Sequence, residues 1–436
     1  MNWRKEYAAK LLSLSEAAGK VKSGDNVVTS IGVGLPYMFF DALAERSEEL
    51  ENVQVFYGAL AKRLSVLDPK YGKAFRGIDY FMAAPARAAL SIGSTLQYQA
   101  IHLSNISNDR FKKHIPNVVA MVGTPPDENG MISLGPCPID SKFLDVCETV
   151  IVQVNEKLPY VRGWECMFPV DRVTWLTEGT EELEYAKIPE PSKEEEAIAA
   201  LIAERVPDGA CIQLGTGGMG NAMGHNLSCR KDLGIHTEMF VETMVELMKC
   251  GAVNNSKKNI CRGFTTYGFA NGSRKMYEFM DHNEHIEARP FRWVNDPRII
   301  AQNDNMVSVN GALQVDLTGQ VCAESIGQKQ YTGPGGQVDF VRGARWSKGG
   351  MSFIAMPSSR IDSKTGKRVS KISLTLPLGS AVTTLRSDIQ YFVTEYGIAD
   401  LEDEPLDVRA KRLIEVAHPD FRDELRFEAK KSGLII

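Results

Sequence analysis

The sequence predicts an α/β fold made of two related, open α/β domains with mainly parallel sheets. The length of the chain, a motif that occurs twice and a proline-containing boundary between the two copies lead to this prediction. With 436 residues, the chain is long for one hydrophobic core, and two domains of about 200 residues each are expected. Apolar residues make up 43% of the chain and charged residues 24%, which is typical of a globular protein.

The motif that occurs twice is an apolar strand, a glycine loop and a helix. Its first copy is SGDNVVTSIGVGLPYMFFDAL at residues 23–43, and its second is PDGACIQLGTGGMGNAM at residues 207–223. Further apolar runs at residues 117–122 and 149–154 alternate with helical stretches. This alternation is typical of parallel sheets covered by helices on both faces. Two copies of one plan indicate two domains of related design.

The segment KIPEPSKEEEAIAALIAERV, residues 187–206, marks the boundary between the copies. Two prolines precede Ser192, and Glu195 follows three residues later, which is the pattern of a capping box at the start of a helix. We therefore expect an N-terminal domain at residues 1–190 and a C-terminal domain at residues 191–436.

Charge and composition argue against several classes of function. The net charge of −5 does not favour binding to nucleic acid or to an anionic membrane. No segment has the roughly 20 apolar residues of a membrane span, and the charged N-terminal segment differs from a secretory signal. The eight cysteines are scattered, with no CxxC pair, which favours reduced thiols and no metal site. We expect a cytoplasmic protein without metal, nucleic acid or membrane partners.

The segment GIHTEMFVETMVELM, residues 234–248, contains three glutamates at intervals of four: Glu238, Glu242 and Glu246. This spacing is typical of the solvated face of a surface helix, and apolar residues at helical spacing follow Glu238. We therefore expect Glu238 to open a helix, where the positive end of the helix dipole would keep it ionised. Glu242 and Glu246 are expected to be solvated surface residues.

The loop at residues 215–220 matches the dinucleotide pattern GxGxxG, and Glu238 lies 18 residues beyond it. An NAD-dependent oxidoreductase is therefore one alternative, although the acid of such a site should end a strand rather than open a helix. A purely structural turn is a second. The third is a loop whose backbone N–H groups bind an anion or a developing oxyanion. Several glycine loops with one carboxylate, and no Ser/His/Asp order, favour acyl transfer.

Several segments together resemble the acetyl-CoA hydrolase/transferase family, and within it the 4-hydroxybutyrate and butyryl-CoA:acetate CoA-transferases. The segments are IQLGTGG at 212–218, GIHTEM at 234–239, VNDP at 294–297, QVDLTGQVCAESIG at 314–327, GPGGQVDFVRGA at 333–344, VTEYGIADL at 393–401 and HPDFRDEL at 418–425. The resemblance extends over essentially the whole chain and implies a class I CoA-transferase-like fold.

The resemblance also implies roles for individual residues. Glu238 matches the family's nucleophile, which forms a glutamyl-CoA thioester, and Asn295 resembles an asparagine that helps to hold the thioester carbonyl. Gly336 is expected to donate to an oxyanion and to contact CoA. Relatives often have proline in place of Gly220, so the shape of this loop is left open. The other expected CoA-binding residues are Gln213, Leu214, Gly215, Thr216, Gly217 and Leu313.

The activity implied is transfer of CoA between a short-chain acyl-CoA and a carboxylate such as acetate. The other acid would be butyrate, 4-hydroxybutyrate, succinate or itaconate. Coenzyme A and acyl-CoA are then substrates, no cofactor is bound permanently, and a homodimer or higher homo-oligomer is expected. An acyl-CoA hydrolase that uses the same glutamate and a non-catalytic CoA-binding protein are alternatives.

Three further expectations concern single residues. Segments 30–35 and 57–60 are expected to form the acyl pocket, with Ile31, Gly32 and Ala59 in its wall. His236 is expected to be a hydrogen-bonded structural residue, because attack by a carboxylate requires no proton to be removed. Glu395, at the end of an apolar strand, is either a site residue or a partner in an ion pair.

Overall fold

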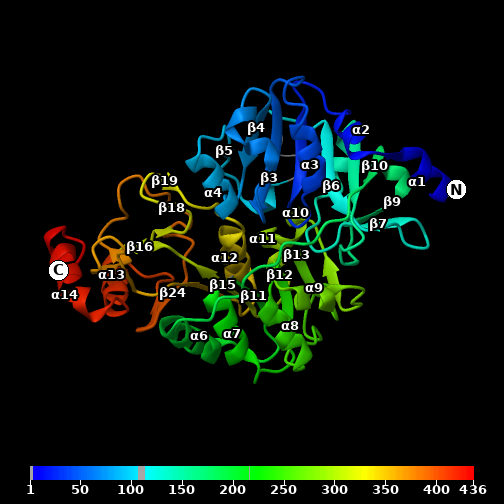
Figure 1. Cartoon of the computed structure of the whole chain (residues 1–436). Helices are drawn as coiled ribbons and strands as arrows, with labels where there is room; N and C mark the ends of the chain where they lie inside the picture. Colours follow the sequence, from blue (N-terminus) through cyan, green and yellow to red (C-terminus); the bar gives the residue numbers. More distant parts are fainter. Residues whose placement is uncertain (1–2, 107–112, 216) are drawn as a thin grey trace. The chain divides into compact units, whose positions relative to one another are not determined.

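The computed structural model describes residues 3–106, 113–215 and 217–436, and these form two compact units (Figure 1). Unit 1 comprises residues 1–186 and 266–294, and unit 2 comprises residues 187–265 and 295–436. The sequence prediction placed residues 266–294 in the second domain, whereas their contacts group them with unit 1. Three of these contacts connect backbone N–H groups of Ala270, His282 and Ala288 to carbonyl oxygens of Pro136, Tyr160 and Arg162.

Unit 1 contains a sheet in the order β1-β10-β8-β6-β2-β3-β4-β5, in which every neighbouring pair is parallel. Its strands are β1 (Leu11–Leu12), β2 (Asn26–Gly32), β3 (Val53–Leu60), β4 (Phe75–Asp79), β5 (Gln97–Tyr98), β6 (Val118–Gly123), β8 (Thr149–Val154) and β10 (Trp175–Glu178). The unit also holds β7 (Met131–Ser133) and β9 (Met167–Pro169), which pair with each other. It further contains β14 (Ile286–Ala288) and all of β13 (Thr265–Ala270) except its first residue. Its helices are α1 (Trp3–Lys10), α2 (Leu14–Ala18), α3 (Tyr37–Ala44), α4 (Ala84–Ser91), α5 (Phe143–Val146), α9 (Arg274–Met280) and α10 (Phe291–Val294).

Burial explains the composition of these strands. Every residue of β6 is buried, and β2 is buried at all positions except its ends. Strands of a parallel sheet that are covered on both faces are apolar without alternation. Helix α3 contributes Phe39, Phe40 and Leu43, each with 0% exposure, to the core of this unit.

Unit 2 contains strands in the order β12-β11-β15-β20-β24-β25, all parallel except the final antiparallel pair. These strands are β11 (Cys211–Leu214), β12 (Gly234–Phe240), β15 (Met306–Gly311), β20 (Met351–Ala355), β24 (Tyr391–Thr394) and β25 (Gly397–Asp400). Short strands follow the chain between them: β16 (Gln314–Asp316), β17 (Val321–Cys322), β18 (Ser325–Ile326), β19 (Lys329–Gln330), β21 (Ser359–Ile361), β22 (Arg368–Ser370) and β23 (Ile372–Ser373).

The helices of unit 2 pack on both sides of these strands. They are α6 (Lys193–Arg205), α7 (Gly218–Leu227), α8 (Glu242–Lys249), α11 (Pro297–Ile300), α12 (Gln337–Trp346), α13 (Leu406–Glu415) and α14 (Pro419–Lys431). Figure 1 shows α6, α7 and α8 on one side of β11 and β15 and α12 on the other. The prediction of two α/β units with mainly parallel sheets is confirmed.

The repeated strand, loop and helix also occur as predicted, as β2 with α3 and as β11 with α7. The capping box before α6 is present as well. The Ser192 side chain accepts a hydrogen bond from the Glu195 backbone at 3.2 Å, and the Glu195 carboxylate accepts one from the Ser192 backbone at 2.8 Å.

The prediction that Glu238 opens a helix is wrong, because the segment GIHTEMF forms strand β12 and the helix begins four residues later, at Glu242. Parallel pairing with β11 draws the start of this segment into the sheet. His236 and Thr237 are therefore fully buried, so the segment lacks the polar and apolar alternation that marks a half-buried strand. Glu246 is exposed on α8, as expected, whereas Glu242 is half-buried.

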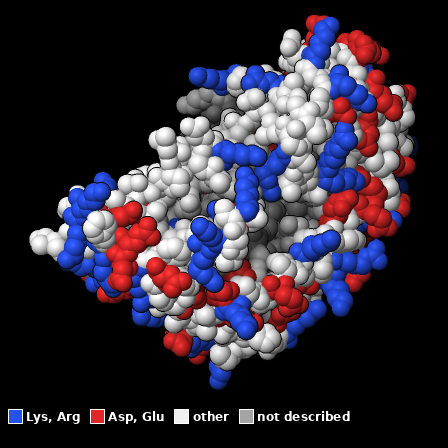
Figure 2. Space-filling view, turned by 60° about the vertical axis from the view of Figure 1, so that its left-hand side comes forward, with Lys and Arg blue, Asp and Glu red and all other residues white. Residues whose placement is uncertain are grey.

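None of the described helices is long and apolar enough to cross a membrane. The face shown in Figure 2 carries both acidic and basic side chains, with large uncharged areas between them. The net charge of the chain is −5.

Candidate active site

The candidate site of unit 2 lies where parallel strands end. Glu238 is near the carboxyl end of β12, and the glycine loop at residues 215–220 follows the neighbouring β11. Carboxyl ends of parallel strands share one edge of a sheet, and ligands of open α/β sheets bind at that edge. The fold therefore brings the carboxylate and the loop to the same edge.

Two hydrogen-bond donors hold the Glu238 carboxylate. The Asn295 amide donates from Nδ2 to Oε2 over 2.7 Å, and the backbone N–H of Gly336 also donates to this carboxyl group. Asn295 has no exposed surface, so its amide is fixed by the surrounding protein. Donors of this kind stabilise negative charge on a carboxylate, or on an oxyanion that replaces it.

Position 336 requires glycine because a side chain would not fit there, and not because of its backbone conformation. Its φ of −98° is accessible to any residue. A Cβ atom at this position would overlap both the Glu238 carboxylate and the Asn295 amide. Because Gly336 also precedes the first residue of α12, the Glu238 carboxylate lies at the N-terminus of a helix, where negative charge is favoured. This helix is α12 and not the one that follows Glu238 in the chain.

The pKa of Glu238 is raised to about 7, mainly because its carboxyl group is buried. The residue as a whole keeps some exposed surface, but the carboxyl group itself is surrounded by protein. The hydrogen bond from Asn295 lowers the pKa, the negative charge of Asp339 raises it, and the hydrogen bond from Gly336 lowers it. The helix dipole was expected to keep this group ionised because Glu238 was expected to open a helix. Glu238 instead lies on a strand, and burial raises its pKa against the effect of the two donors.

The segment expected to bind CoA begins inside the sheet. Gln213 and Leu214 are 4% and 1% exposed, and Gln213 accepts a hydrogen bond from the Asn310 amide at 3.2 Å. Gly215 donates from its backbone to Val309 at 2.9 Å. Gly217, at φ +86°, has open space where a side chain would lie. Thr216 lies outside the described residues.

The remaining residues of the predicted CoA site flank these elements. Leu313 lies two residues beyond the end of β15, and the Gln337 amide of α12 donates to the carbonyl of Gly311 over 2.7 Å. At Gly220, a Cβ atom would overlap the carbonyl oxygen of Gly215. Glycine at this position thus lets the start of α7 pack closely against the preceding loop.

Comparison with known proteins shows the family to which the chain is similar. The sequence model of the acetyl-CoA hydrolase/transferase N-terminal domain matches residues 1–186, and that of the C-terminal domain matches residues 272–429. The succinyl-CoA:cyclohexane-1-carboxylate CoA transferase of Geobacter metallireducens is 39% identical, over 100% of this chain and 98% of the relative.

The chain belongs to the acetyl-CoA hydrolase/transferase family.

Other members of this family are similar over their full length. The butyryl-CoA:acetate CoA-transferase of Anaerostipes caccae is 37% identical over 100% of this chain and 99% of the relative. The structure of RipA from Yersinia pestis superposes with a TM-score of 0.92 at 34% identity, covering 100% of both chains. The 4-hydroxybutyrate CoA-transferase of Porphyromonas gingivalis gives a TM-score of 0.80 at 30% identity, covering 99% of this chain and 100% of the other. The protein is thus an enzyme of the CoA-transferase type.

Family membership, rather than the expected position of Glu238, argues against a nicotinamide enzyme. Glu238 was expected to open a helix, but it lies near the end of a strand that follows a glycine loop, as the acid of a dinucleotide site would. The strand position alone is therefore compatible with both classes. The family assignment, over the whole chain, decides between them.

In unit 1, the structure brings together the three residues expected in the acyl pocket. Strands β2 and β3 pair in parallel, with Ile31 opposite Gly58 and Gly32 opposite Leu60, so Ala59 lies beside the end of β2. The Ile31 residue is only 3% exposed and packs in the interior, whereas Gly32 and Ala59 are half-buried.

Asp339 is the residue of the unit 2 site that the sequence prediction missed. It lies in the first turn of α12, within the segment GPGGQVDF, and its charge raises the pKa of Glu238. Asp339 follows Gly336 by only three residues, so its place near the site could have been expected from the sequence. Only the fold shows that it lies near Glu238, which is far away in the sequence.

Glu395 accepts hydrogen bonds from the backbone and hydroxyl of Ser358 at 2.8 and 2.5 Å.

Proposed function

We propose that this enzyme transfers CoA between short-chain acyl-CoAs and carboxylates by a ping-pong reaction through a glutamyl-CoA thioester on Glu238. The observation that carries the proposal is the buried carboxylate of Glu238 held by two amide donors, Asn295 and Gly336. Two relatives are named as butyryl-CoA:acetate and succinyl-CoA:cyclohexane-1-carboxylate CoA-transferases, which supports this substrate class.

The first half-reaction begins with the ionised Glu238 carboxylate. One oxygen attacks the thioester carbonyl, the C–S bond breaks, and CoA leaves as a thiolate, which produces a mixed anhydride on the enzyme. The thiolate then attacks the glutamyl carbonyl, the anhydride C–O bond breaks, and the donor acid leaves as its carboxylate. Glu238 now holds CoA as a thioester. A second carboxylate reverses these steps and leaves as the new acyl-CoA, so that the energy of the thioester bond is conserved.

Each tetrahedral intermediate of this reaction carries an oxyanion that needs donors. The Asn295 amide and the Gly336 N–H already converge on the carboxyl group that forms and breaks these bonds. One such donor contributes about 10²–10³ in rate, or roughly 3 kcal/mol. The long CoA molecule supplies binding energy far from the reacting carbonyl, which helps to bring it onto the carboxylate.

An acyl-CoA hydrolase that uses the same glutamate is the second candidate, because the family includes hydrolases. The two functions differ in whether water or a second carboxylate attacks the acyl-enzyme anhydride or the glutamyl-CoA thioester on Glu238. Incubation of the protein with butyryl-CoA, with and without acetate, tests this directly. For a transferase, we expect at most one CoA to be retained or released per site without acetate, and continuous formation of acetyl-CoA with it. Continuous release of free CoA without acetate would contradict the transferase proposal.

A further inference from the structure

Gln337 is a buried glutamine at the first residue of helix α12, directly after Gly336, the backbone donor to Glu238. The residue is only 7% exposed. Burying an amide group costs free energy unless hydrogen bonds replace its contacts with water. The partners of this amide therefore show which parts of unit 2 it holds together.

Both polar groups of the Gln337 side chain have partners. Its Nε2 donates to the carbonyl of Gly311 over 2.7 Å, and its Oε1 accepts from the hydroxyl of Thr384 over 2.9 Å. A carbonyl can only accept, so the amide must turn its NH2 group towards Gly311, and its oxygen is left for the hydroxyl. Thr384 is fully buried, and its own backbone N–H donates to Val321 at 3.2 Å. The start of α12 is thus fastened to two other segments.

The bond to Gly311 connects the start of α12 to the sheet that carries Glu238. Gly311 is the last residue of β15, and the Asn310 amide before it donates to Gln213 of β11 over 3.2 Å. Strand β11 pairs with β12, the strand of Glu238. The helix start and the catalytic candidate are therefore held on one sheet, the helix start through the Gln337 side chain and Glu238 through the backbone of its strand.

The residue before Thr384 holds the loop that leads into Gly336. The hydroxyl of this residue, Thr383, donates to the carboxylate of Glu324 over 3.0 Å. The backbone N–H groups of Tyr331 and Thr332 donate to the carbonyl of Glu324 at 2.8 and 3.1 Å. The glycine loop at residues 333–336 follows directly. Gly336 is therefore anchored on both sides, by the start of its loop and by the first residue of its helix.

The exact place of Gly336 matters because its backbone lies tightly against the reacting group. A Cβ atom at this position would overlap both the Glu238 carboxylate and the Asn295 amide. Hydrogen bonds weaken steeply when their length or angle departs from the favoured range, and an oxyanion donor acts only when it is aimed at the developing charge. Because glycine has no side chain of its own to hold it, the direction of the Gly336 N–H depends on the contacts of its neighbours.

We propose that Gln337 is a positioning residue that fixes the Gly336 N–H donor against the Glu238 carboxyl group, with the Thr384 hydroxyl as its support. The proposal rests on the function proposed above. Gln337 acts through the backbone of Gly336 and is not assigned a contact with the reacting atoms.

The pH dependence of CoA transfer from butyryl-CoA to acetate tests this role in the full-length protein. Gln337→Met keeps a side chain of similar size and makes neither hydrogen bond. The Gly336 N–H should then move away from the carboxyl group, and the pKa of Glu238 should rise, because this donor lowers it. We expect the increase of kcat/KM with pH to shift upwards from about 7. The plateau should fall by about tenfold to 10²-fold, less than for complete loss of a donor.

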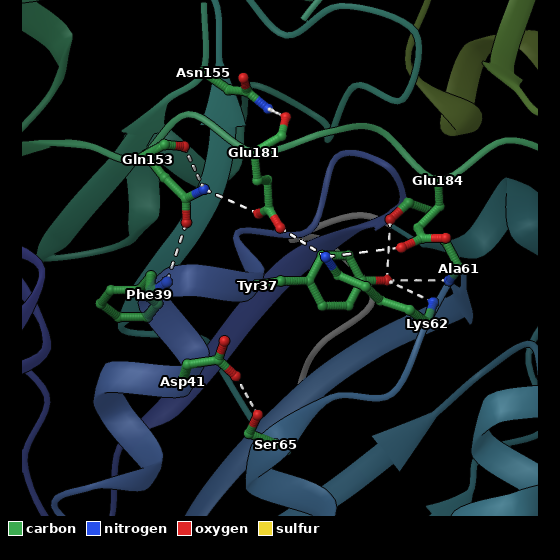
Figure 3. A network of polar contacts seen from close by, with 12 residues as sticks. Tyr37, Phe39, Asp41, Ala61, Lys62, Ser65, Gln153, Asn155, Glu181 and Glu184 are labelled. Atoms are coloured by element: carbon green, nitrogen blue, oxygen red, sulfur yellow. Dashed lines mark hydrogen bonds and ion pairs between the residues drawn. The ribbon is translucent and has the colours of Figure 1, made fainter. Parts of the chain in front are cut away.

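Gln153 of unit 1 provides the matched control. Figure 3 shows this fully buried glutamine between three segments. Its Oε1 accepts from the Phe39 N–H at 3.1 Å, and its Nε2 donates to the Gly179 carbonyl at 2.9 Å and to the Glu181 carboxylate at 3.2 Å. Gln153→Met should lower the melting temperature, because these partners lose their hydrogen bonds. The pH dependence and the plateau of the folded enzyme should equal those of the wild type.

The possible outcomes separate this proposal from the function on which it rests. An active Gln337→Met enzyme with the pH dependence of the wild type would overturn the role of Gln337, even at a lower plateau, and leave the transferase function intact. The same upward shift in Gln153→Met would also overturn the role, because the shift would then follow from the loss of any buried amide. Absence of CoA transfer in the wild type would overturn the function and this role with it.

If Gln337→Met does not fold, the pair Thr384→Val and Thr384→Ser decides. Valine keeps the shape of threonine without the hydroxyl, whereas serine keeps the hydroxyl. A smaller upward shift of the pH dependence in Thr384→Val that is absent in Thr384→Ser supports the proposal. The same pH dependence in both variants overturns it.

Discussion

The surroundings of Glu238 have opposing effects on the pKa of its carboxyl group, and this pKa sets the pH range in which the residue can act. Burial of the carboxyl group and the nearby charge of Asp339 favour the protonated acid, while the Asn295 amide and the Gly336 N–H favour the carboxylate. The result is a pKa of about 7, which leaves a carboxylate that is more basic than an ordinary glutamate and still available near neutral pH. A catalytic group works best when its pKa lies near the pH at which the enzyme acts.

The activity should therefore increase with pH through about 7, because only ionised Glu238 attacks the thioester. We expect kcat/KM for butyryl-CoA to rise about tenfold per pH unit below this value and to level off above it. In Asn295→Ala the rise should move to higher pH, because the hydrogen bond that lowers the pKa is lost, and the plateau should fall by about 10²–10³. A profile that is flat down to pH 5.5 would contradict the raised pKa.

The same pKa predicts a stability effect of Glu238→Gln that depends on pH. The folded pKa of about 7 lies above the usual value of 4.5, so the folded state binds more protons between these values, and stability falls as pH rises through this window. Glutamine cannot ionise and avoids this loss. We expect Glu238→Gln to unfold at a higher temperature than the wild type at pH 8, and the difference to shrink at pH 5. If calorimetry gives the same difference in unfolding temperature at pH 8 and at pH 5, the raised pKa of Glu238 is contradicted.

Gly336 offers a steric test with a matched control. In Gly336→Ala the new methyl group would displace the Glu238 carboxylate or the Asn295 amide, and a displacement of about 1 Å costs about 10² in rate. The same substitution at Gly311 has open space around it and should leave kcat largely unchanged. Comparable losses in the two variants, measured by CoA transfer from butyryl-CoA to acetate, would mean that the contact at position 336 is not decisive.

At the scale of elements, the start of a helix could be predicted where a few consecutive residues form a recognisable cap. The α6 capping box is visible in four consecutive residues, Ser192 to Glu195, and both of its hydrogen bonds are present. The border between β12 and α8 has no such signal. No side-chain cap precedes Glu242, and the four-residue spacing of glutamates continues across the border by coincidence. What makes Gly234 to Phe240 a strand is its pairing with β11, which is a long-range contact.

The capping box of α6 gives a prediction at this scale. Ser192→Ala should lower the free energy of unfolding by about 1 kcal/mol, because the backbone N–H of Glu195 loses its acceptor. Urea denaturation followed by circular dichroism checks this, with the exposed Ser15→Ala of α2 as the control. A loss no larger than that of the control would indicate that the cap contributes nothing to stability.

At the scale of the whole molecule, the predictions that succeeded depend on patterns repeated along the chain. Apolar runs and glycine loops fall at the same places in β2 with α3 and in β11 with α7, so two parallel α/β units could be predicted. The grouping of residues 266–294 with unit 1 could not, because backbone bonds such as Ala288 to Arg162 join segments distant in sequence. The catalytic candidate and its two donors, Asn295 and Gly336, came from a family resemblance. The burial of the Glu238 carboxyl group and the nearby charge of Asp339 did not, because both depend on how distant segments pack together.

The central claim is that Glu238 carries CoA as a covalent thioester. The most direct measurement is mass spectrometry of peptides from the intact protein after brief exposure to butyryl-CoA and acid quenching. We predict a CoA-sized adduct on the peptide that contains Glu238, its loss in Glu238→Gln, its persistence in the matched variant Glu242→Gln, and its release by acetate. An enzyme that transfers CoA to acetate without this adduct, or that keeps the adduct in Glu238→Gln, would contradict the account.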